Sequence, residues 1–207
     1  MKQFLVLCLI CSSFFLLGCD EEKVLSTTTE NMDAKTAIET YLSAADEKGK
    51  GTEIKKGDTI TVDYIGRLND SEVFDTSIES IAKAAGVYSE GRNYEEGLTF
   101  DVGAGQMIAG FDEGVVGMKV GQTKTVTIPA DQAYGQRRDD LVMEFDLSEM
   151  PGAENFQEGQ EVYLNYGMSA VITKKTDKTI TLDMNHKLAG KDLIFDITIK
   201  SINKSSN

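Results

Sequence analysis

The stretch DTITVDYIG, residues 58–66, decides the fold of this chain. Within it Ile60, Val62 and Tyr64 alternate with polar residues, as a strand with one buried face requires. Two further strand-like runs are Thr123–Ile128, which stops at Pro129, and Leu193–Ile199. These runs predict the strands of one antiparallel sheet.

The segments between these strands contain two short helical patterns. Apolar spacing over residues 78–85, closed by Gly86, predicts one helix, and the spacing over residues 111–118 predicts another that ends at Gly121. Strands with few, short helices indicate an α+β domain in which a curved antiparallel sheet wraps one central helix.

Composition limits the function classes. The 207 residues are 41% hydrophobic and 27% charged, which is typical of a globular chain, and the formal net charge is −13. Nucleic-acid binding needs clustered Lys and Arg side chains, and this sequence never assembles them. We therefore expect no nucleic-acid partner.

The N-terminal segment predicts export. Lys2 precedes an apolar run at residues 4–17, which is too short for a membrane-spanning helix and is typical of a signal peptide covering residues 1–18. The following LLGC, residues 16–19, resembles the lipobox of prokaryotic lipoproteins and predicts lipidation of Cys19. The expected location is extracytoplasmic, anchored to the membrane by lipid, on the cell surface or the periplasmic side. An ordinary signal peptide with a chance cysteine is the alternative.

A tether and a helix follow the cleavage site. Residues 19–32 are acidic and Thr-rich, which predicts a flexible tether. Residues 33–51 predict an amphipathic helix of about three turns followed by a linker, with Asp33 as the N-cap and Gly49 and Gly51 as the stop. Packing of its apolar stripe on the main domain is favoured over a dimer or partner contact.

The order of short motifs then resembles the FKBP family of peptidyl-prolyl cis-trans isomerases over nearly all of residues 52–202. The matching motifs are Tyr64-Ile65-Gly66, Val73-Phe74-Asp75-Thr76-Ser77, Gly103 with Ile108-Ala109-Gly110-Phe111, Ala133-Tyr134-Gly135 and Phe195-Asp196-Ile197. The first two resemble the first strand of the family and the loop after it, and Ala133-Tyr134-Gly135 resembles its flap. Five motifs in the right order make a strong resemblance.

The resemblance narrows to the SlyD-like branch, in which a small β domain that grips unfolded chains is inserted in the flap. The pattern breaks after Gly135 and resumes at Asn185-His186-Lys187-Leu188-Ala189-Gly190. This implies an isomerase domain at 52–136 plus 184–202, an inserted chaperone-like domain at 137–183 and a tail at 203–207. Residues 77–97 are longer than in bacterial members and resemble the helical bulge of archaeal ones.

The resemblance implies a set of site residues. The expected catalytic residues are Tyr64, Phe74, Asp75, Ile108, Phe111, Tyr134 and Phe195, with Leu98, Phe100 and Met107 around the rim and walls. The Ile108 N–H and the Tyr134 hydroxyl would bind substrate carbonyls, and Asp75 would orient Tyr64 or polarise the site. Each aromatic alone is more often plain core.

The insert carries a second set of candidates. It holds Val142, Phe145, Phe156, Tyr163, Tyr166 and Met168 among charged residues, and Phe145, Tyr163 and Tyr166 are expected to bind substrate. About half of the set must form the insert's own core, because so small a domain has few apolar residues. Runs at 169–173 and 179–183, flanking a polar turn, predict two strands there.

The sequence predicts no metal site and no cofactor. His186 is the sole histidine, and no His/Cys cluster has metal-ligand spacing. A structural role for His186 is favoured over catalysis. The predicted function is isomerisation of X-Pro bonds in exported or unfolded polypeptides, with chaperone activity in the insert. The alternatives are a catalytically inactive holdase and a membrane-anchored interaction module.

Overall fold

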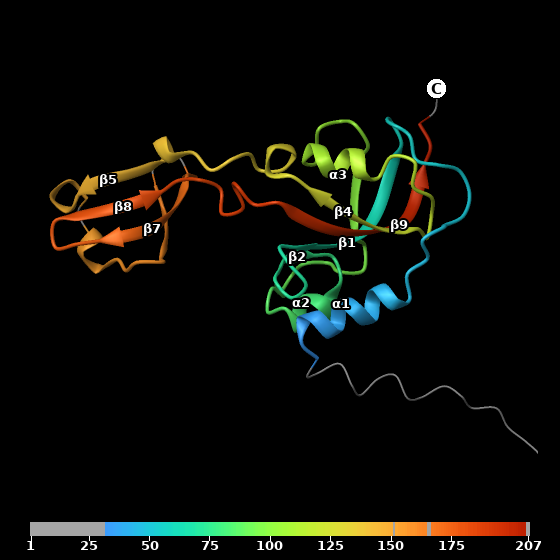
Figure 1. The fold of residues 1–207 in the computed structure, drawn as a ribbon, viewed down its shortest axis with the longest axis horizontal. Coiled ribbons are helices and arrows are strands. Elements are labelled where there is room, and N and C mark those ends of the chain that lie inside the picture. The colour runs from blue at the N-terminus through green and yellow to red at the C-terminus, as the bar shows by residue number, and fades with distance from the viewer. Residues whose placement is uncertain (1–31, 151, 165–166, 206–207) are drawn as a thin grey trace, which may run out of the picture.

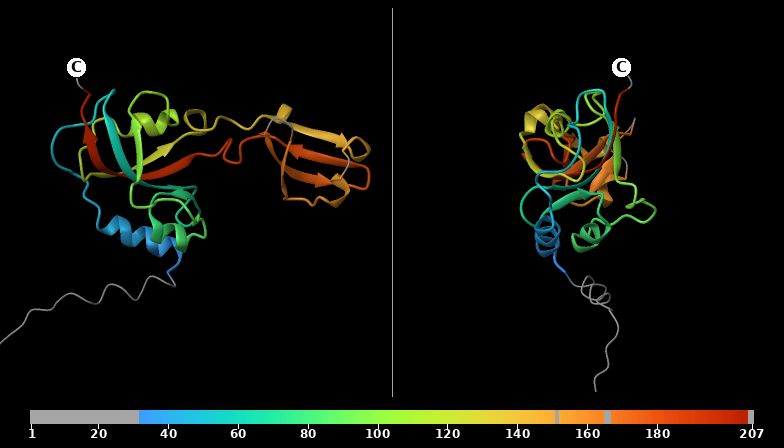
Figure 2. Two further views of the ribbon diagram at one scale, coloured as in Figure 1. Left: turned by 180° about the vertical axis from the view of Figure 1, so that it is seen from behind. Right: turned by 90° about the vertical axis from the view of Figure 1, so that its right-hand side faces the viewer.

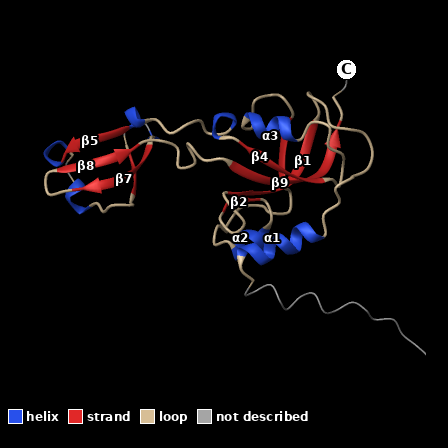
Figure 3. Cartoon of the chain, in the orientation of Figure 1, coloured by secondary structure: helices blue, strands red, loops and turns tan. Residues whose placement is uncertain are grey.

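A computed structural model describes residues 32–150, 152–164 and 167–205. Within them, the helices are α1 (Ala34–Ser43), α2 (Glu79–Ala84) and α3 (Ala109–Gly114), and 3-10 turns cover Ala130–Gln132, Asp139–Leu141, Leu147–Glu149 and Ala153–Asn155. The strands are β1 (Thr59–Arg67), β2 (Val73–Thr76), β3 (Leu98–Asp101), β4 (Thr123–Ile128), β5 (Val142–Asp146), β6 (Glu161–Tyr163), β7 (Ser169–Lys175), β8 (Thr179–Asp183) and β9 (Leu193–Asn203). The predicted α+β class is confirmed, and Figure 3 shows that strands dominate.

The main sheet is antiparallel and has the order β2-β1-β9-β4 in the described chain, with β3 also pairing with β1. β9 lies along the whole of β1, whose other edge is shared by β3 at Thr59–Val62 and by β2 at Ile65–Arg67. Figure 1 shows α3 on one face of this sheet and α1 with α2 on the other. The residues of β1 therefore face two different cores.

The core under α3 surrounds the residues that the motifs singled out. Val62 and Tyr64 of β1 pack there with Phe111 and Val115 of the α3 segment and with Phe195 of β9. A separate cluster on the opposite face joins α1 and α2 to Ile65 and Val73. Alternation along β1 explains the division, because successive side chains point to opposite faces of a strand.

A second antiparallel sheet of four strands, in the order β5-β8-β7-β6, lies within the segment predicted as the insert. Its buried core is built by strands β6, β7 and β8 together with the 3-10 turn at Ala153–Asn155. The buried residues are Ala153, Val162, Ala170, Ile172, Ile180 and Leu182. Phe145 and Phe156 are partly buried and pack against this core, whereas Tyr163 and Met168 are exposed. Tyr166 lies outside the described residues.

Two connecting segments join the sheets, and Figure 2 shows them running to the small unit at one end of the molecule. They are cross-linked by paired bonds: Arg138 N–H donates to Asn185 Oδ1 at 2.8 Å, and Asn185 Nδ2 donates to the Arg138 carbonyl at 2.9 Å. Arg137 adds an ion pair to Asp183 at 2.8 Å. These bonds hold the two segments in register at the base of the small unit.

Several sequence expectations about elements need correction. The α3 helix ends at Gly114 instead of Gly121. It cannot continue to Gly121, because Gly117 has a left-handed φ of 83° and its N–H donates to the Ile54 carbonyl outside the helix. Val73–Thr76, taken as part of a loop, is strand β2. The remaining expected strands are found, with β9 extending beyond Ile199.

The predicted N-terminal helix is α1, and Asp33 caps it by accepting a hydrogen bond from Thr36 N–H at 3.1 Å. The helix ends at Ser43, with Ala44 as its C-cap, and so stops before the predicted end at Gly49 and Gly51. Ala37 and Ile38 on its apolar side are buried within this chain. The predicted signal peptide, Cys19 and nearly all of the tether lie outside the described residues. No helix among the described residues has the length and apolar character needed to cross a bilayer.

Candidate active site

A cavity of about 620 Å³ opens beside α3. This volume lies within the range of about 300–1,000 Å³ that is typical of ligand-binding pockets. Its lining residues are Tyr64, Phe74, Asp75, Leu98, Gln106, Met107, Ile108, Phe111, Tyr134, His186, Lys187, Leu188 and Phe195. All seven predicted catalytic residues are therefore brought together, with Leu98 and Met107 beside them. Phe100 is not in the lining: it is buried against Phe111, at 5.8 Å between ring centroids.

The aromatic floor of the cavity is a set of edge-to-face contacts. Phe111 meets Phe195 at 5.0 Å between ring centroids and 84° between planes, and Phe74 meets Phe195 at 5.5 Å and 83°. Tyr64 contacts Phe111 in the same way at 6.2 Å. Rings in this geometry lock one another, since edge meets face. The floor is thus apolar and preorganised.

Gly66 makes this arrangement possible. A Cβ on Gly66 would lie 2.7 Å from the Phe74 ring and 2.9 Å from the Phe195 ring. A real Cβ atom does not come this close to another carbon atom, so only glycine at this position leaves room for both rings to pack over the strand. This gives a physical reason for the glycine in the Tyr64-Ile65-Gly66 motif.

The loop before α3 is held by side chains of its own. Asp112, buried in the first turn of α3, accepts a hydrogen bond from Gly103 N–H at 2.9 Å, and Gln106 Oε1 accepts one from Asp101 N–H at 2.9 Å. Ile108 is the N-cap residue of α3, so its N–H is not part of the helical ladder. The loop presents Ile108 to the cavity in a fixed position.

Asp75 and Tyr64 form one polar network with Arg92 at the edge of the cavity. The Tyr64 hydroxyl donates to Asp75 Oδ2 at 2.5 Å. Arg92 Nη1 donates to Asp75 Oδ1 at 2.5 Å, and Arg92 Nη2 donates to the Tyr64 hydroxyl oxygen at 2.8 Å. Burial of the ring raises the pKa of Tyr64, and the hydrogen bond to Asp75 raises it further, so the phenol stays protonated and donates.

Tyr134 closes the opposite side of the cavity. It lies in the segment after the Ala130–Gln132 turn, where Gly135 N–H donates to the Ala130 carbonyl at 2.7 Å, and its side chain is 41% exposed. Its ring stacks on His186 at 3.9 Å between centroids and 7° between planes. Burial and the Lys187 charge lower the pKa of His186, so a neutral imidazole forms this stack at pH 7.

Sequence reasoning missed several residues of this site. Arg92 lies far from the family motifs, in the long segment between α2 and β3, so no spacing marked it. Gln106, Lys187 and Leu188 enter the lining from the motif segments on either side. The sequence favours a structural role for His186, but this residue also lines the cavity. Its position directly after the insert was the only signal in the sequence that could have placed it there.

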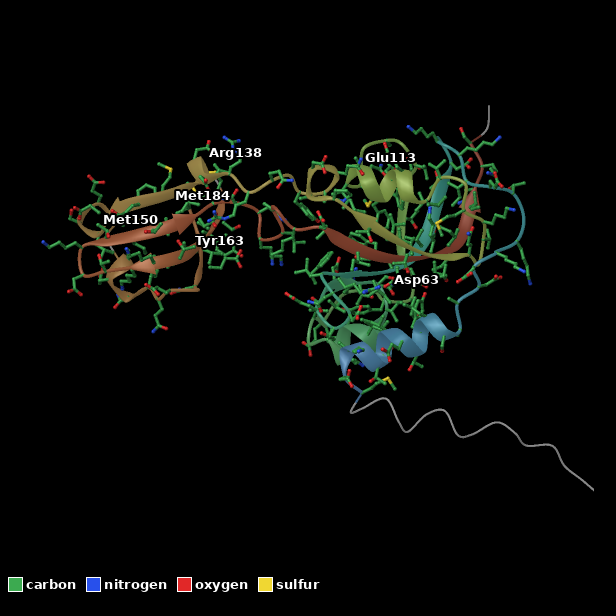
Figure 4. The ribbon with its side chains drawn as sticks, in the orientation of Figure 1. Asp63, Glu113, Arg138, Met150, Tyr163 and Met184 are labelled. Carbon is green, nitrogen blue, oxygen red and sulfur yellow. The ribbon has the colours of Figure 1, made fainter. Side chains whose placement is uncertain are left out.

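The insert has a groove of its own, of about 880 Å³. It is lined by Phe145, Glu149, Met150, Ala153, Phe156, Gln160, Glu161, Val162, Tyr163, Leu164, Met168 and Leu182. Tyr163 and Met168 are 77% and 53% exposed. In Figure 4 the labelled Tyr163 and Met150 lie on the small unit, far from Glu113 of α3.

Comparison with known proteins identifies the class. Residues 50–200 match the family described as FKBP-type peptidyl-prolyl cis-trans isomerase. The chain belongs to this family and is a peptidyl-prolyl cis-trans isomerase, which acts on proline-containing polypeptides. This leaves the inactive-holdase alternative without support.

Individual relatives refine the comparison. The chain is similar to a short-type peptidyl-prolyl cis-trans isomerase of Methanocaldococcus jannaschii, with 46% identity over 149 residues, which cover 72% of this chain and 94% of the relative. It is also similar to FK506-binding protein 2 of Yarrowia lipolytica, with 37% identity over 40% of this chain and 48% of the relative. FK506-binding protein 1A of Neurospora crassa is 40% identical over 44% of this chain and 65% of the relative.

Proposed function

We propose that the cavity beside α3 holds the prolyl ring and its preceding peptide bond during isomerisation. Tyr64, Phe111 and Phe195 supply the apolar walls, and Phe74 supports them from β2. The observation that carries this proposal is the preorganised aromatic floor next to the polar Tyr64–Asp75–Arg92 network.

The chemistry needs no nucleophile. Rotation about the C–N bond costs about 18–20 kcal/mol because amide resonance is lost. The planar amide is more dipolar than the twisted one, so a dry apolar cavity disfavours the ground state relative to the transition state. The Ile108 N–H and the Tyr134 hydroxyl are the proposed donors to substrate carbonyls.

The polar network gives Asp75 a positioning role. Its carboxylate accepts hydrogen bonds from the Tyr64 hydroxyl and from Arg92, so it holds the Tyr64 ring while its own charge is balanced. The Arg92 side chain is 34% exposed and forms an ion pair with Asp75. The twisted amide would therefore meet a carboxylate whose charge is balanced. The network fixes the wall of the cavity and moves no proton.

The insert is proposed to capture unfolded segments of the same substrates, as the SlyD-like resemblance implies. Its groove combines aromatic and thioether side chains, which adapt to varied apolar sequences. Phe145 and Tyr163 are the proposed contacts within the described residues. Capture raises the local concentration of prolyl bonds near the cavity.

The site of action is proposed from the N-terminal sequence. The lipobox-like LLGC predicts lipidation of Cys19 after removal of residues 1–18. The protein would then act on exported chains at the outer side of the cytoplasmic membrane. Mass spectrometry of the membrane-extracted protein tests this: a diacylated or triacylated Cys19 as the first residue supports it, and an intact N-terminus contradicts it.

The proposed site is tested by kcat/KM for a short proline peptide in a protease-coupled assay. We expect Tyr64→Phe and Asp75→Asn each to lower kcat/KM by about tenfold, because each removes a hydrogen bond that positions the cavity wall. Asp177→Asn is the matched control, since Asp177 is exposed on the insert. Full activity of both site variants would contradict the proposed roles.

A further inference from the structure

The helix α1 lies outside residues 50–200, which match the isomerase family, yet it is tightly packed on the catalytic unit. We propose that α1 is a positioning element for the active site: it supports residues 79–97 and thereby holds Arg92 against Asp75 and Tyr64. This inference rests on the role proposed for Arg92 in the cavity.

The first link runs from α1 to α2. Ile38 is 3% exposed and shares a cluster with Ile81 of α2, and Ala84 and Ala85 pack at its edge. Val87, just after α2, packs against the same cluster. The apolar side of α1 therefore fixes both α2 and the start of the segment that follows it.

The second link runs from Val87 to Arg92. Tyr88 stacks on Tyr94 at 5.3 Å between ring centroids, and the Tyr94 hydroxyl accepts a hydrogen bond from Ser89 N–H at 3.0 Å. The Arg92 guanidinium lies 5.3 Å from the centroid of the Tyr94 ring. Tyr88 follows Val87 directly in the chain, so the backbone joins the α1 cluster to the stack, and the stack contacts the guanidinium.

The third link runs through strands β1 and β2 of the main sheet. Ile65 and Val73, which pack in the α1 cluster, lie next in sequence to Tyr64 and Phe74. The other end of α1 is held on β9, where the Tyr41 hydroxyl and Thr198 Oγ1 form a hydrogen bond of 2.7 Å. The helix spans from the rigid sheet to the segment that carries Arg92.

Residues 86–97 need such support. They form no helix or strand, and Gly86, Gly91 and Gly97 adopt positive φ angles. Most of their side chains are exposed or only partly buried. A segment with few buried contacts samples open conformations readily unless it is anchored. The α1 cluster provides the anchor at its N-terminal end, and β3 provides it at the other.

A double-mutant cycle tests the inference on the full chain purified in mild detergent. Ile38→Ala, Arg92→Gln and the double variant are compared with wild type by kcat and KM on a short proline peptide. We expect Arg92→Gln to lower kcat by about fivefold and Ile38→Ala by about threefold, with little change in KM. In the Arg92→Gln background, Ile38→Ala should change kcat by less than about 1.5-fold.

Controls separate this effect from general destabilisation. Glu39→Ala changes the exposed side of the same helix and should leave kcat unchanged. Urea unfolding establishes that each variant is folded under assay conditions, and Ile38→Val supplies a milder version if Ile38→Ala does not fold. An equal loss from the Ile38 substitution in both backgrounds, or no loss in wild type, overturns the inference. Full activity of Arg92→Gln also overturns the inference, because the proposed role of Arg92, on which the inference rests, then fails.

Discussion

The cavity beside α3 and the groove of the insert are both apolar, but they are built in opposite ways. The cavity is walled by rings that lock edge to face, and Phe111 and Phe195 are almost fully buried. The groove is edged by Tyr163 and Met168, which are mostly in solvent. A fixed cavity suits one repeated chemical unit, whereas a soft, exposed surface suits many sequences.

The difference also appears in polar anchoring. At the cavity, Tyr64, Asp75 and Arg92 are joined by hydrogen bonds of 2.5–2.8 Å. The groove is lined mainly by apolar side chains, with Glu149, Gln160 and Glu161 as its polar members. On the proposed function, the cavity would hold its substrate in one orientation, and the groove would retain the chain without orienting it. Turnover of a large substrate should need both.

The largest expected effect separates the contribution of the groove from that of the cavity. We predict that replacing residues 137–183 with a short loop lowers kcat/KM for a proline-limited unfolded protein by about 100-fold, because capture supplies effective concentration. Turnover of a tetrapeptide should stay within about twofold, since the cavity remains. Refolding and tetrapeptide assays on the same preparation measure the two values.

The comparison fails if both substrates lose activity equally in this variant. That result would mean that the insert completes the cavity itself. Tyr134 and His186 lie beside the junctions, so the replacement must keep the hydrogen bond from Gly190 N–H to the Gly135 carbonyl, 2.8 Å long. Circular dichroism establishes that the main sheet remains folded.

The next effect concerns the rigid floor. Gly66→Ala places a methyl group against the Phe74 and Phe195 rings, at distances that the rings cannot accept without moving. We expect a loss of about 1–3 kcal/mol in the free energy of unfolding and about a tenfold loss of kcat/KM on a tetrapeptide. Urea unfolding and the protease-coupled assay measure them. Wild-type stability and activity in Gly66→Ala would contradict the role assigned to Gly66, because the added methyl group cannot be accommodated unless the rings move.

A smaller effect isolates the groove. Tyr163→Ser and Met168→Ser together should weaken suppression of aggregation by about threefold, because the apolar contact area falls. Their stability should change by less than about 0.5 kcal/mol, since both side chains are exposed. Light scattering of an aggregating substrate measures the first value. Unchanged suppression would show that the groove is not the capture surface.

The sequence predicts the cavity better than it predicts the groove. Tyr64 and Phe195 lie in segments whose alternating pattern predicts strands. Because these two strands pair in the sheet, their side chains are brought to the same site. Arg92 could not be found this way, because its contacts arise from the folding of a segment without regular structure. Likewise Phe100 alternates correctly along β3 but turns into the core behind Phe111. Local patterns fix faces, and tertiary packing decides which residues on a face reach the cavity.

The smallest effect is a pH profile. Burial, with the Asp75 hydrogen bond, raises the pKa of Tyr64 above its ordinary value of about 10, so its phenol stays protonated through pH 9. Rotation of the amide moves no proton, so kcat/KM should be flat from pH 7 to 9. Burial and Lys187 lower the pKa of His186 below its ordinary value of about 6.5.

The sign of the acid limb follows from that lowered pKa. Because the folded state disfavours the imidazolium, the neutral Tyr134–His186 stack is at full strength above about pH 6.5 and weakens as the pH falls through the lower folded value. We expect a shallow fall of kcat/KM on the acid side, absent in His186→Phe, which keeps a ring against Tyr134 without a titrating group. The groove has no histidine, so capture measured by light scattering should lack this limb. If kcat/KM of His186→Phe still falls on the acid side, another group must cause the fall. The difference in pH dependence between cavity and groove could then not be attributed to His186.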